Sequence, residues 1–370
     1  MTEFTAPKSF TGVDAPPATD DSALASRIVS LVLRSLRNSN EVLTEQRLAE
    51  VVAKYIGAVR QARTLEQQQI EMRQFFSPKV VEALARSGPA ALEPRQGPVS
   101  VLFCDVRGFS RKVEESSDDL HALLARVREA LSVMTRNILK HDGVIADFQG
   151  DAALGFWGWP QASEDSPALA CRAALAIQKE FAEAQRDPFH ELHGFHVGIG
   201  ICHGEAITGR IGSDEQIKVG VFGPIVNTAS RLQDLTKQVG VPILVDGPTA
   251  DAVADYLPPS VATCRRVTRL RPAGIATPVD VFSLSSGHGP GRGQGESLTF
   301  VEEQAYELAS EAVESGHWVK ARRLLSKLPA KYGPANFLRR AIRDSGQRPP
   351  ANWDGVLTMD RKDLAGVLAG

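Results

Sequence analysis

Two short runs near the middle of the 370-residue chain decide its fold, and each places one aspartate at a strand end or in a turn. The first is Val101-Leu-Phe-Cys-Asp105-Val-Arg-Gly-Phe-Ser110, an apolar strand that ends on an acid and then turns. The second is Gly143-Val-Ile-Ala-Asp-Phe-Gln-Gly-Asp151-Ala-Ala-Leu-Gly-Phe156, two apolar runs joined by a Gln-Gly-Asp turn. A strand end and a hairpin turn can share one edge of a sheet, so we expect Asp105 and Asp151 to lie close together. Two adjacent carboxylates are costly, and a bound divalent cation removes that cost.

A third run supplies two more polar side chains at helical spacing. It is Val221-Phe-Gly-Pro-Ile-Val-Asn227-Thr-Ala-Ser-Arg231-Leu, which places Asn227 and Arg231 one helical turn apart on one face. Taken singly, each of the four residues has an ordinary structural alternative. Asp105 can cap a helix, Asp151 can serve a hairpin turn, Asn227 can start a helix, and Arg231 can form a surface ion pair.

Taken together, in this order and spacing, the three runs resemble the catalytic domain of class III adenylyl and guanylyl (nucleotide) cyclases of bacterial type. The resemblance covers residues 98–285 and continues through Gly198-Ile-Gly-Ile-Cys-His-Gly204-Glu-Ala and Gly209-Arg-Ile-Gly-Ser213. Several motifs in one order are more specific than one acidic pair, so within this framework the four residues favour a metal-nucleotide site. The resemblance implies an α+β, ferredoxin-like fold, which the mixture of strands and helices permits.

The apolar pattern predicts the order of helices and strands within this domain. We expect a strand (99–104), a long helix (118–140), a hairpin (143–149 and 151–157), a helix (165–184) and a strand (195–202). A second hairpin, a helix (226–238), a strand (242–245), a helix (248–256) and two late strands follow.

The resemblance also implies a reaction and the ions that assist it. Members of the family cyclise a nucleoside triphosphate when its ribose 3′-hydroxyl attacks the α-phosphorus and pyrophosphate leaves. Two Mg²⁺ or Mn²⁺ ions per site activate the hydroxyl and neutralise phosphate charge. Asp105 and Asp151 match the metal-binding aspartates, and the backbone carbonyl of Val106 matches a further ligand. Two aspartates suffice because the triphosphate supplies the remaining oxygens.

Other positions match the groups that hold the substrate. Asn227 matches the residue that orients the ribose, and Arg231 matches the guanidinium that steadies charge on the transferring phosphorus. The turn that carries Phe109 and Ser110 runs towards a helix, where free N–H groups can cradle the β- and γ-phosphates. In this family the aspartates of one subunit face Asn227 and Arg231 of the other. The resemblance therefore implies a homodimer, or a heterodimer with a partner cyclase.

The chain departs from the family where the base is selected. Adenylyl cyclases carry a lysine at the position of Asp147 and an Asp or Thr at the position of Gly220. A phosphate-contacting lysine is also missing near the last strands, where Arg271 is the nearby replacement. A carboxylate accepts from guanine N1–H and N2–H₂, and guanylyl cyclases place an acid at this position, so Asp147 is compatible with GTP. The alternative is a solvated strand residue, and the family as a whole favours ATP.

Two functions compete. The leading hypothesis is an enzyme of signal transduction that makes a 3′,5′-cyclic monophosphate from a purine nucleoside triphosphate, and the intact metal pair favours it. The alternative is a catalytically weak or inactive nucleotide-binding and dimerisation module with a regulatory role. The altered base and phosphate contacts favour that module.

The segments before the domain are predicted from composition and periodicity. Residues 1–21 lack an apolar period and are expected to be disordered. Residues 22–87 form a helical segment that can pass on the state of an upstream sensor. Its apolar positions fit either a short coiled coil or one amphipathic helix: Leu48, Val52, Tyr55, Val59 and Ala62. Ser77 and Pro78 signal a helix start. Residues 88–98, rich in Pro and Gly, are read as a linker.

Three further segments follow the domain. Residues 286–297 are read as a Gly-rich linker. Residues 298–345 resemble one tetratricopeptide-type helix pair around Gly316. A single unit cannot bury its own apolar face, so it must pack on the catalytic domain or on a partner. Residues 346–370 form a tail in which Trp353-Asp-Gly-Val356 is a candidate docking strand.

Composition narrows the partners and the compartment. Lys and Arg total 42 and Asp and Glu 44, a formal charge of -2, so no strong field attracts nucleic acid or anionic lipid. The chain has no apolar run long enough to span a membrane and no signal-peptide pattern at its start. Its 4 cysteines are scattered. We therefore expect a cytoplasmic protein with reduced thiols. His203 and the Trp157-Gly-Trp159-Pro160 run are expected to be structural.

Overall fold

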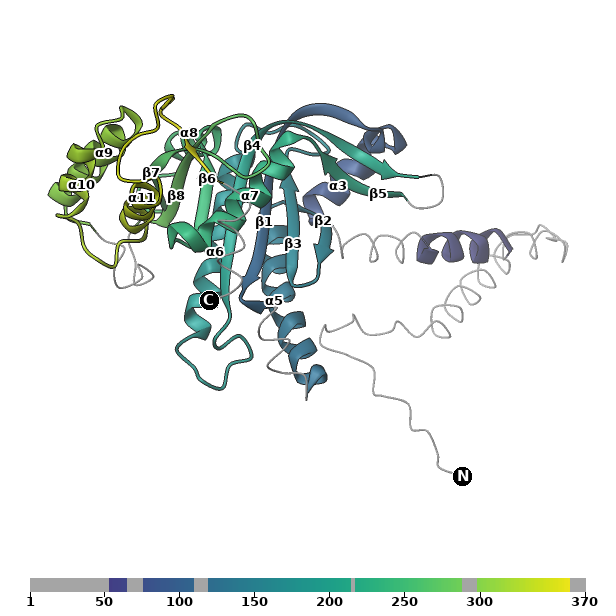
Figure 1. Ribbon diagram of the computed structural model, residues 1–370. Coiled ribbons are helices and arrows are strands. Elements are labelled where there is room, and N and C mark those ends of the chain that lie inside the picture. The colour runs from purple at the N-terminus through teal and green to yellow at the C-terminus, as the bar shows by residue number, and fades with distance from the viewer. Residues whose placement is uncertain (1–52, 65–75, 110–118, 214–216, 288–297, 360–370) are drawn as a thin grey trace, which may run out of the picture. The chain divides into compact units, whose positions relative to one another are not determined.

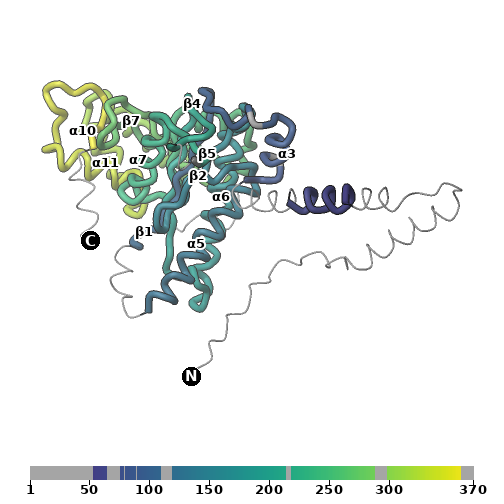
Figure 2. Tube along the Cα trace, turned by 90° about the vertical axis from the view of Figure 1, so that its right-hand side faces the viewer, coloured from purple at the N-terminus to yellow at the C-terminus, as the bar shows by residue number. Residues whose placement is uncertain are grey.

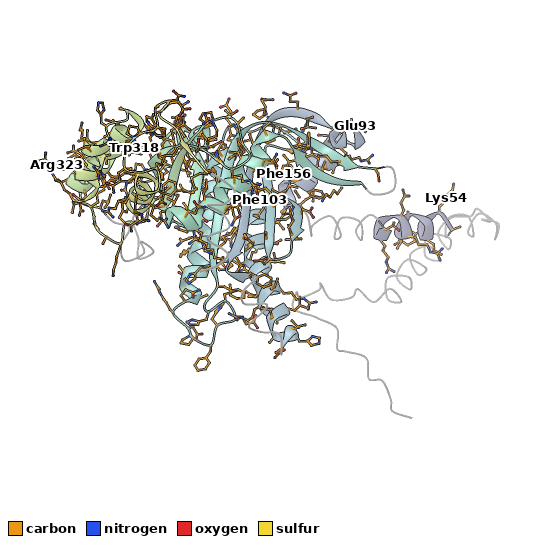
Figure 3. The ribbon with its side chains drawn as sticks, viewed as in Figure 1. Lys54, Glu93, Phe103, Phe156, Trp318 and Arg323 are labelled. Carbon is orange, nitrogen blue, oxygen red and sulfur yellow. The ribbon has the colours of Figure 1, made fainter. Side chains whose placement is uncertain are left out.

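The computed structural model describes residues 53–64, 76–109, 119–213, 217–287 and 298–359 of the chain. The chain divides into two compact units, residues 1–68 and 69–370. In the first unit, residues 53–64 are helical (Lys54 is labelled in Figure 3), which agrees with the predicted helical segment. Leu48 and Val52 lie outside the described residues, so the coiled-coil seam stays a prediction.

The second unit begins with the predicted helix start. Helix α3 (Pro78–Ser87) has Ser77 as its N-cap, and the Ser77 side chain accepts a hydrogen bond from the Val80 N–H. A short 3-10 helix, η1 (Pro89–Leu92), precedes strand β1 (Arg95–Arg107). The expected linker over 88–98 is therefore wrong in its second half. Residues 95–98 pair with a neighbouring strand, from Arg95 opposite Thr208 onwards, and this pairing extends β1 before the predicted start at 99.

A nine-stranded sheet forms the centre of this unit, in the order β2-β3-β1-β4-β6-β8-β7-β9, with β5 paired to β4 (Figure 1). Its remaining strands are β2 (Val144–Gln149), β3 (Ala152–Trp157), β4 (His196–Gly212), β5 (Ile217–Phe222), β6 (Ile243–Asp246), β7 (Ala262–Arg271), β8 (Val279–Ser286) and β9 (Leu357–Thr358). The helices within the domain are α5 (Leu120–Lys140), α6 (Ser166–Ala184), α7 (Pro224–Val239) and α8 (Gly247–Tyr256). The predicted α+β order is confirmed. Ser286, the first residue of the predicted linker, belongs to β8. Residues 288–297 lie outside the described part.

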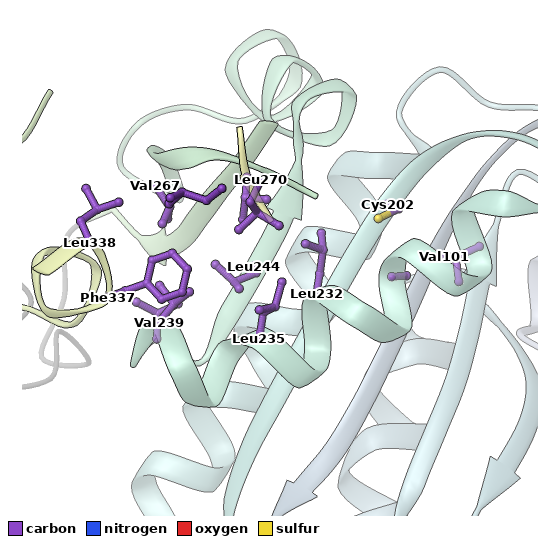
Figure 4. Packing of buried hydrophobic residues seen from close by; sticks show 14 of the residues in the cluster. Val101, Cys202, Leu232, Leu235, Val239, Leu244, Val267, Leu270, Phe337 and Leu338 are labelled. Carbon is purple, nitrogen blue, oxygen red and sulfur yellow. The ribbon is translucent and has the colours of Figure 1, made fainter. Parts of the chain in front are cut away.

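The two faces of the sheet are covered by different helices, and strand β1 shows how the sequence decides this. Leu102, Cys104 and Val106 point to a core shared with α5, α6 and α8. Val99, Val101 and Phe103 alternate with them and point to a core shared with α7. Figure 4 shows Leu232, Leu235 and Val239 of α7 in this second core, and Figure 2 shows the arrangement from the side. Asp105 has the same parity as Val101 and Phe103, which places it on the α7 side of the sheet.

Close contact between α7 and the sheet depends on a glycine in β4. A Cβ at Gly200 would lie 2.1 Å from the backbone oxygen of Ala229 and 2.4 Å from the backbone nitrogen of Gln233. Any side chain would therefore push α7 away from β4. The Gly-Ile-Gly-Ile run that the sequence shows at 198–201 is explained by this packing.

Residues 298–359, called the C-terminal module below, pack on the β7 end of the sheet (Figure 1). The module contains α9 (Phe300–Glu314), α10 (Trp318–Leu325), α11 (Gly333–Asp344) and β9. The Tyr306 hydroxyl donates to the Val267 carbonyl of β7 at 2.8 Å, and Trp318 is buried within the module. The predicted helix pair thus gains a third helix, and the docking strand is residues 357–358 instead of 353–356, paired parallel to β7.

Within the described part of the chain, no helix combines the length and the apolar character needed to cross a bilayer.

Candidate functional site

The two aspartates that the sequence singles out are placed together by two strands and a turn. Asp105 lies near the end of β1, opposite Gly198 of β4. Asp151 follows Gly150 in the turn between β2 and β3, and β3 is paired to β1. Gly150 has a φ of 65°, a left-handed conformation that glycine adopts without strain, and it lets the hairpin turn tightly enough to present Asp151. The prediction of their proximity agrees with the electrostatics of the pair.

The pair is electrostatically strained. Burial and the adjacent charge of Asp151 raise the pKa of Asp105 from 3.8 to about 7. Burial also raises the pKa of Asp151, although hydrogen bonds from its own backbone amide, from Asp105 and from the backbone amide of Val106 oppose this rise. One oxygen of Asp151, Oδ2, is buried and has no hydrogen-bond partner in the described part of the chain. A buried oxygen acceptor without a donor is costly, and a cation would satisfy it.

This donor set fits a hard divalent cation. Carboxylate oxygens are the ligands that Mg²⁺ and Mn²⁺ prefer, and two converging acids with a spare oxygen provide them. Among the described side chains, no group of three or more His, Cys, Asp or Glu is arranged to enclose a metal. The remaining ligands would have to be oxygens of the backbone, of water or of a bound phosphate chain. Such an open site suits a metal that meets its substrate in the site.

Asn227 and Arg231 lie on α7 in a different pocket. The pocket has a volume of about 790 Å³ and is lined by both residues, by the start of α8 and by residues 273–280, which are the connection from β7 and the first two residues of β8. Its lining, taken over the described residues, includes neither Asp105 nor Asp151. In a single chain the acidic pair and the Asn227–Arg231 pair therefore do not line one common pocket.

Asp234, which the sequence analysis missed, interacts with a residue of each pair, Arg231 and Asp105. Its carboxylate accepts from Arg231 Nη1 at 3.0 Å, one helical turn further along α7. Its charge also contributes to the raised pKa of Asp105. The (i, i+3) spacing of Arg231 and Asp234 is visible in the sequence and could have identified the ion pair. The proximity of Asp234 to Asp105 depends on the packing of α7 over β1, so it could not be identified from the sequence.

Asp147 is engaged by a residue that the sequence analysis also missed. Its Oδ2 accepts from Lys218 Nζ, which lies on β5. Both side chains are partly exposed, so the bond is a solvent-screened one. Gly220, two residues further along β5, is buried and offers no side chain. The carboxylate of Asp147 is therefore not free to accept a base edge unless Lys218 releases it.

Arg271 serves the fold in this structure. Its Nε donates to the Ala276 carbonyl at 2.9 Å, its Nη1 to Thr358 Oγ1 at 3.1 Å and its Nη2 to Asp354 Oδ2 at 3.1 Å. The predicted contact with substrate phosphate stays untested, but every nitrogen of the guanidinium already has a protein partner.

Val106 follows Asp105 directly in β1. The Val106 side chain is buried in the core under α5 and α6, so only its backbone can face a ligand. Phe109 packs against the same core. Ser110 lies outside the described residues. His203 is structural, as expected: its Nδ1 lies 2.9 Å from the buried Ser100 hydroxyl.

Comparison with known proteins gives a family for the central domain. Residues 92–252 match the sequence model of the adenylate and guanylate cyclase catalytic domain. Adenylate cyclase 1 of Rhizobium meliloti (strain 1021) is 29% identical over 195 residues, which make up 50% of this chain and 27% of that protein. An uncharacterised protein of Mycobacterium tuberculosis is 28% identical over 157 residues, 42% of this chain and 28% of the other. The chain thus spans only a minor part of these relatives.

A solved structure shares the fold. A bacterial light-regulated adenylyl cyclase superposes with a TM-score of 0.50 at 19% identity, over 69% of this chain and 68% of the other. The predicted fold class is therefore confirmed, and residues 92–252 match the family that the sequence motifs resemble.

Proposed function

We propose that this chain, whose residues 92–252 belong to the family of adenylate and guanylate cyclase catalytic domains, converts a purine nucleoside triphosphate to a 3′,5′-cyclic monophosphate and pyrophosphate. The observation that carries the proposal is the pair Asp105 and Asp151. Burial and the adjacent Asp151 raise the pKa of Asp105, burial raises the pKa of Asp151, and a buried oxygen, Asp151 Oδ2, lacks a donor in the described part of the chain. In a purely structural pair, nothing would offset this unfavourable free energy.

The reaction is an internal displacement at phosphorus. A bond forms between the ribose O3′ and the α-phosphorus, the bond from that phosphorus to the bridging oxygen of the β-phosphate breaks, and the 3′-hydroxyl proton leaves to solvent. Mg²⁺ or Mn²⁺ bound at Asp105 and Asp151 would supply Lewis-acid activation of the hydroxyl and neutralise the phosphate charge. The two carboxylates would hold the positive charge of the cation at the edge of the sheet.

Asn227 and Arg231 carry the rest of the chemistry. The Asn227 amide is exposed on the first turn of α7 and can fix the ribose by hydrogen bonding. Arg231 offers a planar set of donors that suits the equatorial oxygens of a phosphorus undergoing substitution. Arg231 is held by Asp234, which fixes the direction of its guanidinium before substrate binds.

A complete site requires two subunits. In a single chain, the pocket that holds Asn227 and Arg231 excludes the aspartate pair. A two-fold dimer would bring the aspartates of one subunit to the pocket of the other, and would create two equivalent sites. We propose a homodimer through the cyclase domain, and a signalling role in which other segments or a sensor protein regulate that dimer.

We propose ATP as the substrate, with GTP as the alternative. A free Asp147 would favour guanine, but the ion pair with Lys218 neutralises this acid. Lys218 then presents an ammonium near the same position, and an ammonium donates to ring acceptors such as those of adenine.

The test is product formation by the purified full chain, with ATP and GTP in parallel and with Mg²⁺ or Mn²⁺. Asp105→Ala is expected to abolish cyclic product, and Asp255→Ala, which removes an exposed acid of α8, is the matched control. Mixing Asp105→Ala chains with Arg231→Ala chains should restore part of the activity, because one of the two sites in a mixed dimer is intact. If the wild-type chain is folded and dimeric but gives no product from either triphosphate, the enzyme hypothesis is wrong and the regulatory module is the remaining alternative.

A further inference from the structure

One wall of the Asn227–Arg231 pocket is a short connection that has little internal support. Residues 273–280 line the pocket: residues 273–278 connect β7 to β8, and Val279 and Asp280 begin β8 and pair with β7. Three residues of the connection, Gly274, Ala276 and Thr277, are exposed. The connection itself is closed by one backbone hydrogen bond, from Ile275 N–H to the Pro272 carbonyl at 3.0 Å. A loop with so few contacts depends on its neighbours for a fixed conformation.

The first such neighbour is the tail of the C-terminal module, which acts through Arg271. The guanidinium of Arg271 donates at one end to the Ala276 carbonyl of the wall, at 2.9 Å. At the other end it donates to Asp354 and Thr358 of the tail, each at 3.1 Å. The pKa of Asp354 is lowered by this hydrogen bond, as expected for a carboxylate that stays ionised against Arg271.

A second neighbour is helix α9 of the same module, which acts through Arg266. Arg266 Nη2 donates to Asp280 Oδ1 of the wall at 2.7 Å, while its Nη1 donates to Glu314 Oε1 at 2.6 Å. Glu314 is 23% exposed and lies at the end of α9. Two arginines of β7 therefore each join one residue of the pocket wall to one acid of the C-terminal module.

The two acids belong to one rigid piece. Trp353 Nε1 donates to the Glu314 carbonyl at 2.9 Å, and its ring packs edge-on against Trp318, with centroids 5.2 Å apart. Strand β9 continues from this tail and pairs with β7, where the Met359 N–H donates to the Arg271 carbonyl at 3.0 Å. Displacement of the tail would therefore release both links together.

We propose that the C-terminal module positions the wall of the nucleotide pocket, with Asp354 and Glu314 as positioning residues that act through Arg271 and Arg266. The inference rests on the proposed function only for the identity of the ligand as a nucleotide. The contacts between the module and the pocket wall do not depend on that function. A partner that contacts the outer surface of the module can therefore change how well residues 273–280 are ordered. A competing interpretation is that the same bonds only attach the module to the sheet.

Hydrogen exchange of the full chain without nucleotide separates these interpretations. Asp354→Asn, Thr358→Val and Glu314→Gln each weaken one link without removing volume. Each is expected to speed exchange of residues 273–280 by about threefold, the equivalent of a partly exposed charged hydrogen bond. Asp344→Asn is the matched control, because Asp344 is an exposed acid of the same module whose only ion pair among the described residues is with its neighbour Arg343.

The kinetic readout is the balance between KM and kcat. With the wall loosened, the KM for the triphosphate is expected to rise by about threefold, while kcat stays close to wild type, because Asp105, Asp151 and Arg231 are untouched. Asp344→Asn should leave both constants unchanged.

The outcomes are distinct from those that test the enzyme. If exchange increases in the module alone and residues 273–280 keep their wild-type protection in all three variants, the module is only attached and the inference is overturned. If residues 273–280 lose protection while wild-type chain makes no cyclic product, the positioning holds and the cyclase function fails.

Discussion

The electrostatic cost of placing Asp105 beside Asp151 gives a prediction that needs no substrate. Asp105→Asn removes one charge of the pair and keeps the size of the side chain. The pKa of Asp105 rises from 3.8 to about 7 in the folded chain, a difference of about three pKa units. At about 1.4 kcal/mol per unit this corresponds to about 4 kcal/mol, and partial solvent contact reduces the expected effect to about 2 kcal/mol.

The sign of the effect follows from proton counting. Because the folded pKa lies above the unfolded value, the unfolded chain binds fewer protons than the folded chain between about pH 4 and pH 7. The metal-free wild type therefore loses stability as pH rises through this window. Asp105→Asn lacks this loss, so it should be more stable than wild type at about pH 8 and similar to it at about pH 5.

The assay is urea unfolding of both chains in a chelating buffer at the two pH values, followed by the same measurement with Mn²⁺. The cation should stabilise wild type at the higher pH and have a much smaller effect on Asp105→Asn, since ligand binding to the folded state alone raises stability. A wild-type-minus-variant difference that is the same at both pH values would refute the assignment of the strain to this pair.

Three further predictions test the neighbouring elements. Lys218→Met frees Asp147 and should move the ratio of kcat/KM for ATP and GTP towards GTP, measured with both triphosphates under one condition; an unchanged ratio would remove Asp147 from base selection. Gly200→Ala should destabilise the chain by about 3 kcal/mol or more in urea unfolding, because the new Cβ would meet the backbone of Ala229, and a near-neutral result would show that α7 can shift freely. Burial raises the pKa of Asp246 from 3.8 to about 6, so Asp246→Asn should flatten the decline in stability between about pH 4 and pH 6, and an unaltered pH profile would contradict this.

Much of the fold was predictable because its signals are local. The hairpin at 143–157 and helix α5 follow from apolar periodicity and turn residues, and the structure confirms them. The starts of β1 and the extent of β4 were not predictable in the same way. Residues 95–98 are polar or turn-forming and become a strand only because β4 continues past Gly204 to receive them. Pairing between segments so distant in sequence leaves no local periodic trace.

The candidate site shows the same division. The chemical types of Asp105, Asp151, Asn227 and Arg231 are visible in three motifs, and their roles remain proposals that the geometry supports. Their partners are not visible. Lys218 lies 71 positions from Asp147, and the contact exists because β5 returns beside β2. A sequence can therefore nominate the groups that do chemistry, but the groups that hold or neutralise them are selected by tertiary packing.

Position 271 shows why the residue type matters more than the charge. The family resemblance leads one to look there for a lysine-like contact with phosphate. An ammonium is one nitrogen at the end of a flexible stem, and it could not reach Ala276, Asp354 and Thr358 at once. The planar guanidinium of Arg271 reaches all three with separate nitrogens. Arginine at this position is therefore explained by its contacts with the C-terminal module and with the wall of the pocket.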